Sequence, residues 1–451
     1  MRILLLNYEF PPLGAGGGKA SQKIAESLVE MGHTVRVVTS RPTQPYRLTG
    51  NLMLLIGVGF WVYLAYAKIT FNEDISDHGF TLLGTLLLLI GFILRNTALT
   101  WELTSPVRGL KRLEFINGVE VRRVPVFRRR PDYCSIPEMG SFVLSAAWYS
   151  LRNTHDFKPD IVHIFFAIPD GPLGWLLKRS HRLPYIVSLR GADVPSDEVQ
   201  RFATAYKILR PIIVRLYQDA DAMVAVSNGL RKQAHYTTPD LPIEVITNAI
   251  DLSYFTPPLQ LRQHQCIRLI FVGRLTTAKN PIAIVKALNH LKTLDIGEFE
   301  LELVGDGDQR ADLEQYVIDQ NLTKWVKFVG WVERDQLLKH YQQADIFVTA
   351  TTWEGMPNTV LEAMATGLPV VGTQAPGLDQ LVRDGRNGYI IGLNDIEALA
   401  DRLARLISNS HERQRMGKES RKIAEREFSW EHISAQYVDV YNRILAEKKG
   451  A

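Results

Sequence analysis

The sequence of 451 residues is poor in cysteine. Its two cysteines, Cys134 and Cys266, lie far apart, without a histidine or a second cysteine at the spacing of a metal site. Neither a disulfide framework nor a zinc site is therefore supported. The apolar N-terminal run Met1–Leu6 is too short for a signal peptide. A net charge of +4 is too small at this length to indicate nucleic-acid binding, and we expect no nucleic-acid partner.

Short apolar strands alternate with helical sequence along most of the chain. The first unit has a strand, a glycine-rich turn, a helix over Lys19–Met31 and a second strand. The alternation is interrupted by a polar, proline-containing stretch, Tyr254–Gln265. Because strand–helix–strand crossovers require parallel strands, the sequence predicts an α/β protein with two doubly wound, Rossmann-like domains facing a cleft. Their predicted bounds are 1–255 and 266–428, followed by a helical segment over 429–451.

Residues 48–94 break this alternation. They contain two uncharged apolar stretches, Leu48–Ala67 and Gly79–Leu94, joined by a polar loop. The first has about the 20 residues needed to cross a bilayer, whereas the second reaches only roughly 24 Å. Basic residues flank the pair and acidic residues lie in its loop, which predicts that both domains lie on the cytoplasmic side. We expect a membrane-associated helical hairpin inserted in the first domain, spanning or re-entrant. The alternative is a buried hairpin, although these stretches lack a polar face.

A run of glycines follows the first strand and opens a helix. Gly16 and Gly17 lie in this run, where backbone N–H groups and a helix N-terminus can approach an anionic group. The alternative is a flexible turn that binds nothing. The run does not end in Lys-Ser or Lys-Thr, which argues against a Walker P-loop.

Two cations follow a strand of the second predicted domain. The strand Leu269–Val272 ends at Gly273 and Arg274, and Lys279 lies five residues further on. Open α/β sheets bind ligands at the carboxyl ends of their strands. Arg274 and Lys279 can there bind a diphosphate and neutralise a departing nucleoside diphosphate. The alternative is a pair of ordinary solvated charges.

One loop and the helix after it carry the strongest functional signal. Glu354 is predicted in the loop, and Glu362 follows in the first turns of the helix, with seven residues between them. The helix N-terminus offers N–H groups to phosphate, and a carboxylate one turn into the helix can accept hydrogen bonds from ribose hydroxyls. The intervening residues specify a loop shape, which favours a site over two solvated carboxylates: Gly355, Asn358 and Thr359.

Together these motifs resemble glycosyltransferase family 4, which has the GT-B fold. The resemblance covers nearly the whole chain except roughly residues 43–112. It rests on Gly273–Lys279, Glu354–Glu362, Val304–Gly307, Asn248–Phe255 and Phe428–Glu431. It implies retaining transfer of a hexose-type sugar from a UDP- or GDP-sugar, without a metal or other cofactor. The second domain would hold the donor, the first would hold the acceptor, and the last segment would cross back onto the first domain.

The resemblance also implies roles for individual residues. Arg274 and Lys279 would hold the diphosphate, Glu362 the ribose, and Glu354 the hydroxyls of the donor sugar. Arg274, Lys279 and Glu354 are thereby candidates for the catalytic centre. Further donor contacts are expected from Gly16, Gly17, Gly273, Gly305, Asp306, Val332, Gly355, Asn358 and Thr359.

The first domain departs from the family pattern at the strand Ile161–Phe166. Many relatives have His-x-His here, whereas this chain has His163 followed by Phe165. His163 is a candidate catalytic residue, and the alternative is a core or strand-end histidine. Arg190 stands where relatives often have histidine. Arg190 and Asp193 are candidates for acceptor binding.

Two short acidic patterns raise a metal-dependent alternative. Asp219–Asp221 and Asp306–Asp308 both read Asp-x-Asp, but such tripeptides arise easily by chance. The first resembles a turn between a helix and a strand. We expect no metal ion.

Basic segments in the first domain point to a membrane acceptor. Arg122–Arg123, Arg128–Arg130 and Arg201–Arg215 predict contact with anionic headgroups, although each segment alone is compatible with a solvated face. The sequence therefore predicts a lipid-linked acceptor, such as a polyprenyl-diphosphate oligosaccharide or a glycerolipid. The alternatives are a GT-B nucleotide-sugar epimerase and a membrane-bound nucleotide-sugar-binding protein without transfer activity.

Overall fold

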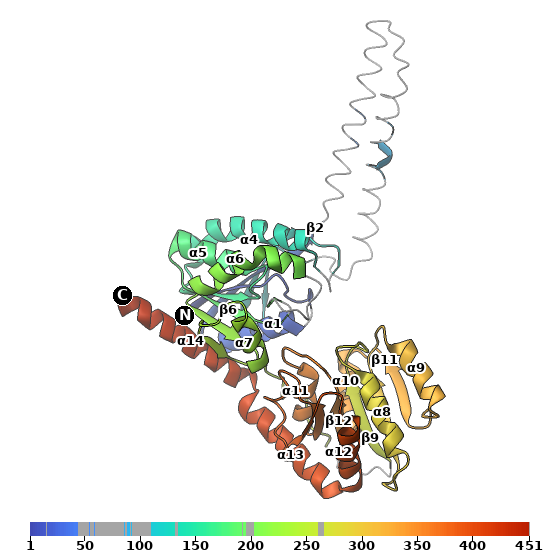
Figure 1. The fold of residues 1–451 in the computed structure, drawn as a ribbon. Helices are drawn as coiled ribbons and strands as arrows, with labels where there is room; N and C mark the ends of the chain where they lie inside the picture. The colour runs from blue at the N-terminus through green and yellow to red at the C-terminus, as the bar shows by residue number, and fades with distance from the viewer. Residues whose placement is uncertain are drawn as a thin grey trace, which may run out of the picture.

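The chain folds into two α/β domains joined by a linker and by a long C-terminal helix (Figure 1). The computed structural model describes residues 1–43, 110–194, 203–259 and 266–450, apart from residues 15, 131–133 and 192, together with a few isolated residues between 54 and 92. The hairpin predicted over 48–94 lies almost entirely outside the described residues. Within the described part of the chain, no helix is both long and apolar enough to cross a membrane.

An eight-stranded sheet in the order β3-β4-β2-β1-β5-β6-β7-β8 forms the centre of the first domain. Helices α4, α5 and α6 lie over one side of this sheet, and α1 lies on the other (Figure 1). The strands are β1 (Arg2–Leu6), β2 (Thr34–Thr43), β3 (Leu113–Ile116), β4 (Val119–Phe127), β5 (Ile161–Phe165), β6 (Tyr185–Leu189), β7 (Ala222–Ala225) and β8 (Ile243–Val245). The helices are α1 (Gly16–Glu30), α4 (Ile136–Phe157), α5 (Gly171–His181), α6 (Ala203–Asp219) and α7 (Asn228–His235).

The first sheet contains one antiparallel pair, β3 with β4, which the expectation of parallel strands did not include. These two strands are joined by Asn117 and Gly118, whose φ angles of 48° and 82° are both in the left-handed region. Asn-Gly with two positive φ angles is the signature of a tight two-residue hairpin. The remaining neighbours in this sheet pair in parallel.

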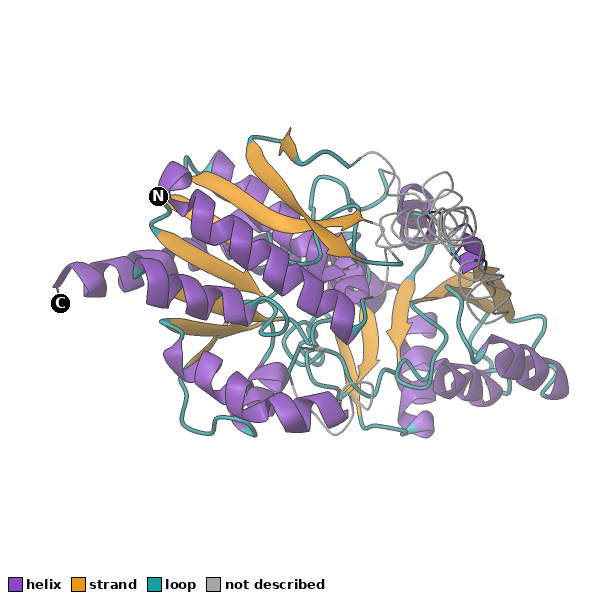
Figure 2. Cartoon of the chain, turned by 90° about the horizontal axis from the view of Figure 1, so that it is seen from above, coloured by secondary structure: helices purple, strands orange, loops and turns teal. Residues whose placement is uncertain are grey.

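The second domain has a six-stranded parallel sheet in the order β11-β10-β9-β12-β13-β14. Helices pack on both faces of this sheet, so its central strands are buried (Figure 2). Burial on both faces explains why the sequences of these parallel strands are apolar. The strands are β9 (Ile267–Val272), β10 (Phe299–Val304), β11 (Val326–Gly330), β12 (Ile346–Thr349), β13 (Val370–Thr373) and β14 (Gly388–Ile391). The helices are α8 (Pro281–Leu291), α9 (Arg310–Asp319), α10 (Arg334–Gln343), α11 (Asn358–Ala365), α12 (Ile396–Ser408) and α13 (Ser410–Glu427).

The last helix, α14 (Trp430–Gly450), leaves the second domain and packs against α1 of the first (Figure 1). The crossing begins where Ile250 N–H donates to the carbonyl of Phe428 at 2.8 Å. Tyr437 and Tyr441 of α14 are fully buried in the core of the first domain. The end of the sequence therefore completes a domain that begins at the start of the sequence.

Candidate functional site

Two helix N-termini, one from each domain, meet between the domains. A Cβ atom added to Gly16, the first residue of α1, would lie 3.1 Å from Nδ2 of Asn358, the first residue of α11. A Cβ atom on Gly17 would lie 2.5 Å from the ring of Phe166, so a side chain there requires that ring to move. The positive ends of two helix dipoles and their unpaired N–H groups favour an anionic ligand at this point.

A cavity of about 260 Å³ opens beside this junction, with walls from both domains. Among its basic residues, Lys19 and Lys23 come from α1 and Arg334 from α10. The other residues that line it are Gly16, Ala20, Asn248–Asp251, Phe255, Trp331–Glu333, Leu337, Asn358, Glu362 and Trp430. The predicted donor residues Gly16, Val332, Asn358 and Glu362 are thus brought together.

Glu362 is held in the wall of this cavity by Tyr341. The hydroxyl of Tyr341 donates to Oε2 of Glu362 at 2.8 Å. Burial raises the pKa of Glu362 to about 7, although the hydrogen bond and the charges of Arg334 and Lys19 oppose this shift. Its carboxyl group therefore changes charge near neutral pH, a property often seen at functional sites.

Lys279 forms an ion pair with Glu354. Both side chains are largely buried, with 22% and 18% of their surfaces exposed. Burial, followed by the charge of Arg274, lowers the pKa of Lys279 to about 8. Neither residue of this pair lines the 260 Å³ cavity, although Glu354 is only four residues before Asn358. The pair therefore forms a second charged element near the start of α11.

Glycines let the loops after β9 and β10 approach each other closely. Gly305 has a φ of 135°, and a Cβ atom there would lie 2.0 Å from the carbonyl oxygen of Gly273. Leu275 N–H donates to the carbonyl of Asp306 at 3.0 Å, while the Asp306 side chain pairs with Arg310. Gly273, Gly305 and the backbone of Asp306 thus shape the sheet edge that carries Arg274. The side chain of Asp306 forms its ion pair with Arg310, four residues further along the chain.

A chain of hydrogen bonds connects the two domains. Arg190 Nη1 donates to Oδ1 of Asn248 at 3.0 Å, and Asn248 Nδ2 donates to Oδ1 of Asn358 at 3.0 Å. Arg190 Nη2 also donates to the hydroxyl of Tyr437 at 3.2 Å, and its guanidinium lies 4.5 Å from the ring centroid of Phe165. Nearby, a Cβ atom on Gly355 would lie 3.3 Å from the carbonyl oxygen of Arg190. Arg190 is therefore positioned at the junction, next to the loop that carries Glu354.

His163 lies in the core of the first domain rather than at the cleft surface. Its side chain is fully buried between Tyr441, 2.7 Å from Nδ1, and Ser188, 2.7 Å from Nε2. Burial, followed by the charge of Arg190, lowers its pKa well below the ordinary value, so the ring is neutral at physiological pH. This geometry agrees with the core-histidine alternative.

Asp193 is buried and organises the turn after β6. Its carboxylate accepts hydrogen bonds from the N–H groups of Ala167, Arg190 and Gly191. Burial nevertheless raises its pKa above the ordinary value. Because its oxygens already have these partners, Asp193 positions the backbone of Arg190 rather than offering a carboxylate to an acceptor.

Both aspartates of the first Asp-x-Asp pattern have partners in the protein. Asp221 pairs with Lys178 and accepts from Tyr185 N–H, while Asp219 lies 3.7 Å from Arg179. Among the described residues, no group of three or more His, Cys, Asp or Glu side chains is placed to hold a metal ion.

Two of the arginines expected at anionic headgroups point inward. Arg123 is 3% exposed and bonds to Glu114 and to the carbonyl of Pro11. Arg128 is also 3% exposed and donates to the carbonyl of Tyr8. The prediction of membrane contact was therefore wrong for these two side chains, because each guanidinium is bonded to groups inside the domain.

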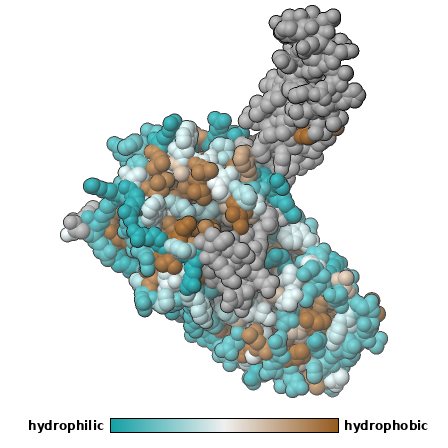
Figure 3. All heavy atoms as spheres, turned by 45° about the horizontal axis from the view of Figure 1, so that its top comes forward, coloured by the Kyte–Doolittle hydropathy of each residue, from teal (hydrophilic) through white to brown (hydrophobic). Residues whose placement is uncertain are grey.

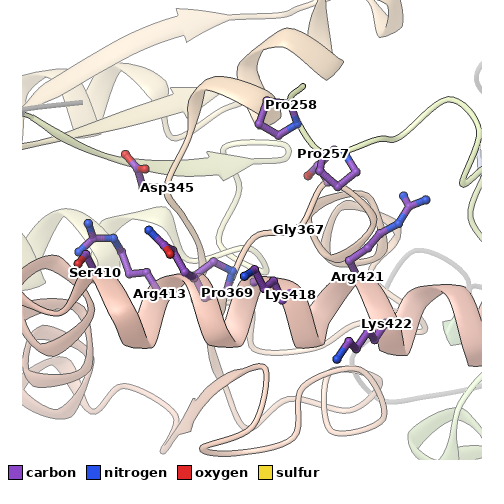
Figure 4. Close-up of a pocket in the computed structure, with 13 residues that line it drawn as sticks. Pro257, Pro258, Asp345, Gly367, Pro369, Ser410, Arg413, Lys418, Arg421 and Lys422 are labelled. Carbon is purple, nitrogen blue, oxygen red and sulfur yellow. The ribbon is translucent and has the colours of Figure 1, made fainter. Parts of the chain in front are cut away.

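A second cavity, of about 420 Å³, lies between the interdomain linker and α13 (Figure 4). Pro257, Pro258 and Pro369 form much of its wall. Arg413 and Arg421 also line it, but they donate to backbone carbonyls of α12, the linker and α11. These arginines tie neighbouring segments together, so we assign this cavity no part in the candidate site.

The site residues that the sequence did not predict include Lys19, Lys23, Asn248, Arg334 and Tyr341. Lys19 follows the glycine run directly, so its position at the start of α1 was a usable signal. Asn248 lies in a motif that carried the family resemblance. Tyr341 is twenty-one residues from Glu362 on a different helix, and no pattern in the sequence indicates their contact.

Comparisons with known proteins agree with this arrangement. Two family models match: "Glycosyl transferase 4-like domain" over residues 91–249 and "Glycosyl transferases group 1" over residues 260–423. The N-acetyl-alpha-D-glucosaminyl L-malate synthase of Bacillus anthracis is 26% identical over 303 residues, covering 64% of this chain and 76% of that protein. The UDP-Gal:alpha-D-GlcNAc-diphosphoundecaprenol alpha-1,3-galactosyltransferase of Escherichia coli is 29% identical over 262 residues, covering 55% and 66%.

Among solved structures, HepE of Anabaena, in complex with UDP and glucose, aligns with a TM-score of 0.64. The alignment covers 98% of this chain and 99% of that chain at 17% sequence identity, so it supports the fold alone. The chain contains a glycosyl transferase 4-like domain followed by a glycosyl transferases group 1 domain, on a GT-B-like fold. It therefore belongs to the glycosyltransferases.

Proposed function

We propose that this protein transfers a hexose from a nucleoside-diphosphate sugar to a lipid-linked acceptor at a membrane, with retention of anomeric configuration. One observation carries the proposal: the N-termini of α1 and α11 meet beside a cavity that contains Lys19, Lys23, Arg334 and Glu362. Such a cavity suits a ligand with phosphate charges and hydroxyl groups. HepE binds UDP in its solved complex, and the E. coli relative is named for a UDP-sugar donor, which supports a UDP-sugar here.

The residues of the second domain suit departure of a nucleoside diphosphate. As the bond between the sugar and the phosphate breaks, negative charge grows on the leaving diphosphate. Arg274 and Lys279 would neutralise that charge, together with the N–H groups at the start of α11. Glu354, paired with Lys279, would bind hydroxyls of the sugar, and Glu362 would accept a hydrogen bond from the ribose. None of these roles uses a metal ion.

The acceptor part of the proposal rests on the sequence of the first domain. Residues 48–94 contain the two long apolar stretches, and both domains are proposed to lie at the cytoplasmic side of a membrane. The E. coli relative is named for a diphosphoundecaprenol-linked acceptor, whereas the B. anthracis relative is named for L-malate. A lipid-linked acceptor is favoured here because a soluble acceptor would leave the apolar stretches without a purpose.

The test is release of nucleoside diphosphate by the full chain from a panel of UDP- and GDP-sugars. Each donor is supplied with vesicles carrying polyprenyl-diphosphate N-acetylglucosamine, with plain vesicles, or with L-malate. We expect turnover of one donor that depends on the lipid-linked sugar and is lost in Lys279→Ala and Glu362→Ala. Lys327→Ala is the matched control, because Lys327 lies on the same domain and its side chain is 65% exposed.

Each other outcome overturns a defined part of the proposal. Turnover with L-malate alone would overturn the lipid-linked acceptor. Epimerisation of the donor without any acceptor would replace transfer by epimerase activity. Binding of UDP without turnover under every condition would identify a nucleotide-sugar-binding protein. The anomeric configuration of the product, determined by NMR, tests retention separately.

A further inference from the structure

Helix α4 presents an apolar stripe on the outer surface of the first domain. Ile136, Leu144 and Trp148 are spaced by multiples of four residues and therefore share one face of the helix. Their side chains are 48%, 76% and 60% exposed, so this face has no cover within the described part of the chain. Figure 3 shows apolar surface gathered on the outer side of the first domain. Exposed apolar side chains grouped in this way mark interaction sites.

The stripe continues onto neighbouring elements. Phe127, at the end of β4, is half exposed, and its N–H donates to Oγ of Ser141 in α4 at 2.9 Å. On α6, which covers the same side of the sheet, Ile212 is also half exposed (Figure 1). Half-exposed apolar side chains therefore lie on more than one element on this side of the sheet.

The charges around this surface are mainly positive. Arg152 lies next to Trp148, with its guanidinium 4.5 Å from the centroid of the indole, and Arg210 and Arg215 are exposed on α6. Helix α4 has two acidic residues: Glu138, which is buried and bonded to Ser135, and Asp156, which is exposed near the end of the helix. Residues 203–218 of α6 contain no acidic residue. Apolar side chains flanked by three exposed arginines and one exposed carboxylate, Asp156, leave a net positive surface that matches an anionic lipid surface.

The apolar segment of the sequence joins the fold at the same place. Strand β2 ends at Thr43, which pairs directly with Phe127. The chain beyond Thr43 enters the region that contains Leu48–Ala67 and Gly79–Leu94. A segment with the composition of a membrane anchor is thus attached next to the stripe of α4.

From these observations we propose that the outer face of α4, with Phe127 and Ile212, rests on a lipid bilayer that contains anionic headgroups. Trp148 and Leu144 lie among the headgroups and upper acyl chains, and Arg152, Arg210 and Arg215 contact lipid phosphates. This inference deepens the membrane part of the proposed function, because it assigns the surface that holds the first domain at the membrane. Two other occupants, the segment 48–94 and a second copy of the chain, are distinguished by the test.

The test places a fluorescent label on the stripe of the full chain in vesicles. Leu144→Cys is labelled in a background of Cys134→Ala and Cys266→Ser, and its fluorescence is measured with nitroxide-labelled lipid and with iodide in the water. We expect quenching by the lipid nitroxide and protection from iodide. The matched control is Ile318→Cys on α9 of the second domain, where the native side chain is 58% exposed, and we expect quenching by iodide only.

Three results overturn the proposal. Quenching of the Leu144 site by iodide alone means that the stripe faces water. Protection from both quenchers means that protein covers it, either residues 48–94 or a second copy, and cross-linking then identifies which. Lipid quenching that is equal with and without anionic lipid, and unchanged by Arg152→Gln with Arg215→Gln, removes the proposed role of the arginines. No donor or acceptor is present, so these results are independent of whether the protein transfers sugar.

An activity measurement then connects the surface to the reaction. With the acceptor in anionic vesicles, Leu144→Glu with Trp148→Glu should lower turnover by about tenfold or more, because a charged stripe is repelled from the headgroups. With a short-chain acceptor in detergent, the same variant should keep the native rate. Equal losses in both conditions would contradict a docking role for this face.

Discussion

The two domains have similar sheets but use the polar residues near their junction differently. In the first domain, His163 is buried between Ser188 and Tyr441, and the carboxylate of Asp193 accepts three backbone N–H groups. In the second, Lys279 and Glu362 have pKa values shifted toward neutrality and lie at or near the interdomain cleft. These polar groups of the first domain thus bond within its own core and backbone, whereas in the second domain Lys279 pairs with Glu354 and Glu362 with Tyr341 beside the cleft.

The difference follows from what covers each sheet. Helix α14 packs Tyr437 and Tyr441 into the first domain, where their hydroxyls lie within hydrogen-bonding distance of Ser188 and His163. In the second domain, the loops after β9 and β10 approach each other closely at Gly273 and Gly305, and Arg274 and Lys279 follow Gly273 in the sequence. We therefore expect changes in the second domain to affect turnover and changes in the first to affect mainly stability.

The largest expected effect is that of Lys279→Ala. Loss of a cation beside a leaving diphosphate should lower kcat/KM by roughly 100- to 1,000-fold, as is usual for a group that stabilises charge in the transition state. Lys279→Arg should recover part of this loss, because the charge is kept and only the geometry changes. Steady-state kinetics of Lys279→Ala and Lys279→Arg, beside the exposed control Lys327→Ala, measures the loss and the recovery. Native kcat/KM in Lys279→Ala would contradict the expectation that changes in the second domain lower turnover.

The dependence of kcat/KM on pH should separate the roles of Glu362 and Lys279 in the second domain. Glu362 loses its proton near pH 7, and Lys279 loses its own near pH 8. If the ionised carboxylate and the protonated amine bind the donor, kcat/KM rises through about 7 and falls through about 8. Glu362→Gln should abolish the acidic limb and leave the alkaline one. A profile with the same two limbs in this variant would show that Glu362 is not the group responsible.

Glu362 should also affect the stability of the free protein. Its folded pKa of about 7 is higher than the unfolded value of 4.5, so its contribution to stability is complete below about pH 4.5 and is lost as the pH rises through about 7. Above pH 7, Glu362→Gln should therefore stabilise the protein, by up to about 3 kcal/mol. Urea unfolding at pH 5 and pH 8 measures the difference, and equal stability of the two proteins at pH 8 would contradict the shift.

Arg190 lies in the first domain, but we expect its replacement to affect turnover more than stability. Its bond to Asn248, and through it to Asn358, connects it to the second domain. Arg190→Lys removes at least one of its two bonds and should lower kcat by roughly tenfold, with little change in stability. A double-mutant cycle with Asn248→Ala should give less than the sum of the separate effects. Additive effects would indicate that the two residues act independently.

The smallest effect on turnover is expected for His163→Phe. Because its ring is fully buried and neutral, kcat/KM should stay within about threefold of the native value. Stability should fall by about 1–3 kcal/mol, since Tyr441 and Ser188 each lose a buried partner. Denaturant unfolding measured beside the kinetics separates the two. A loss of turnover as large as that of Lys279→Ala would restore His163 as a catalytic candidate.

The sequence predicted the α/β architecture and most strands because parallel strands carry long apolar runs with clear ends. The strand predicted to end at Val272 does so, whereas α1 begins at Gly16 and not at Lys19, since glycines were interpreted as a turn. Strand β3 was missed, although Asn117-Gly118 marks its hairpin. The association of Glu362 with Tyr341 was beyond prediction, because it depends on how two helices pack rather than on either sequence.

The crossing of α14 has a consequence for synthesis on the ribosome. Translation makes the eight strands of the first sheet long before Tyr437 and Tyr441, which fill its core. The second domain contains all of its own strands, so we expect its sheet to form without α14 and before the first domain is complete, the reverse of the usual N-terminal-first order. The first domain has to wait for the last helix to emerge from the exit tunnel. A nonsense codon near position 430 should thus disrupt the half of the protein that was translated first.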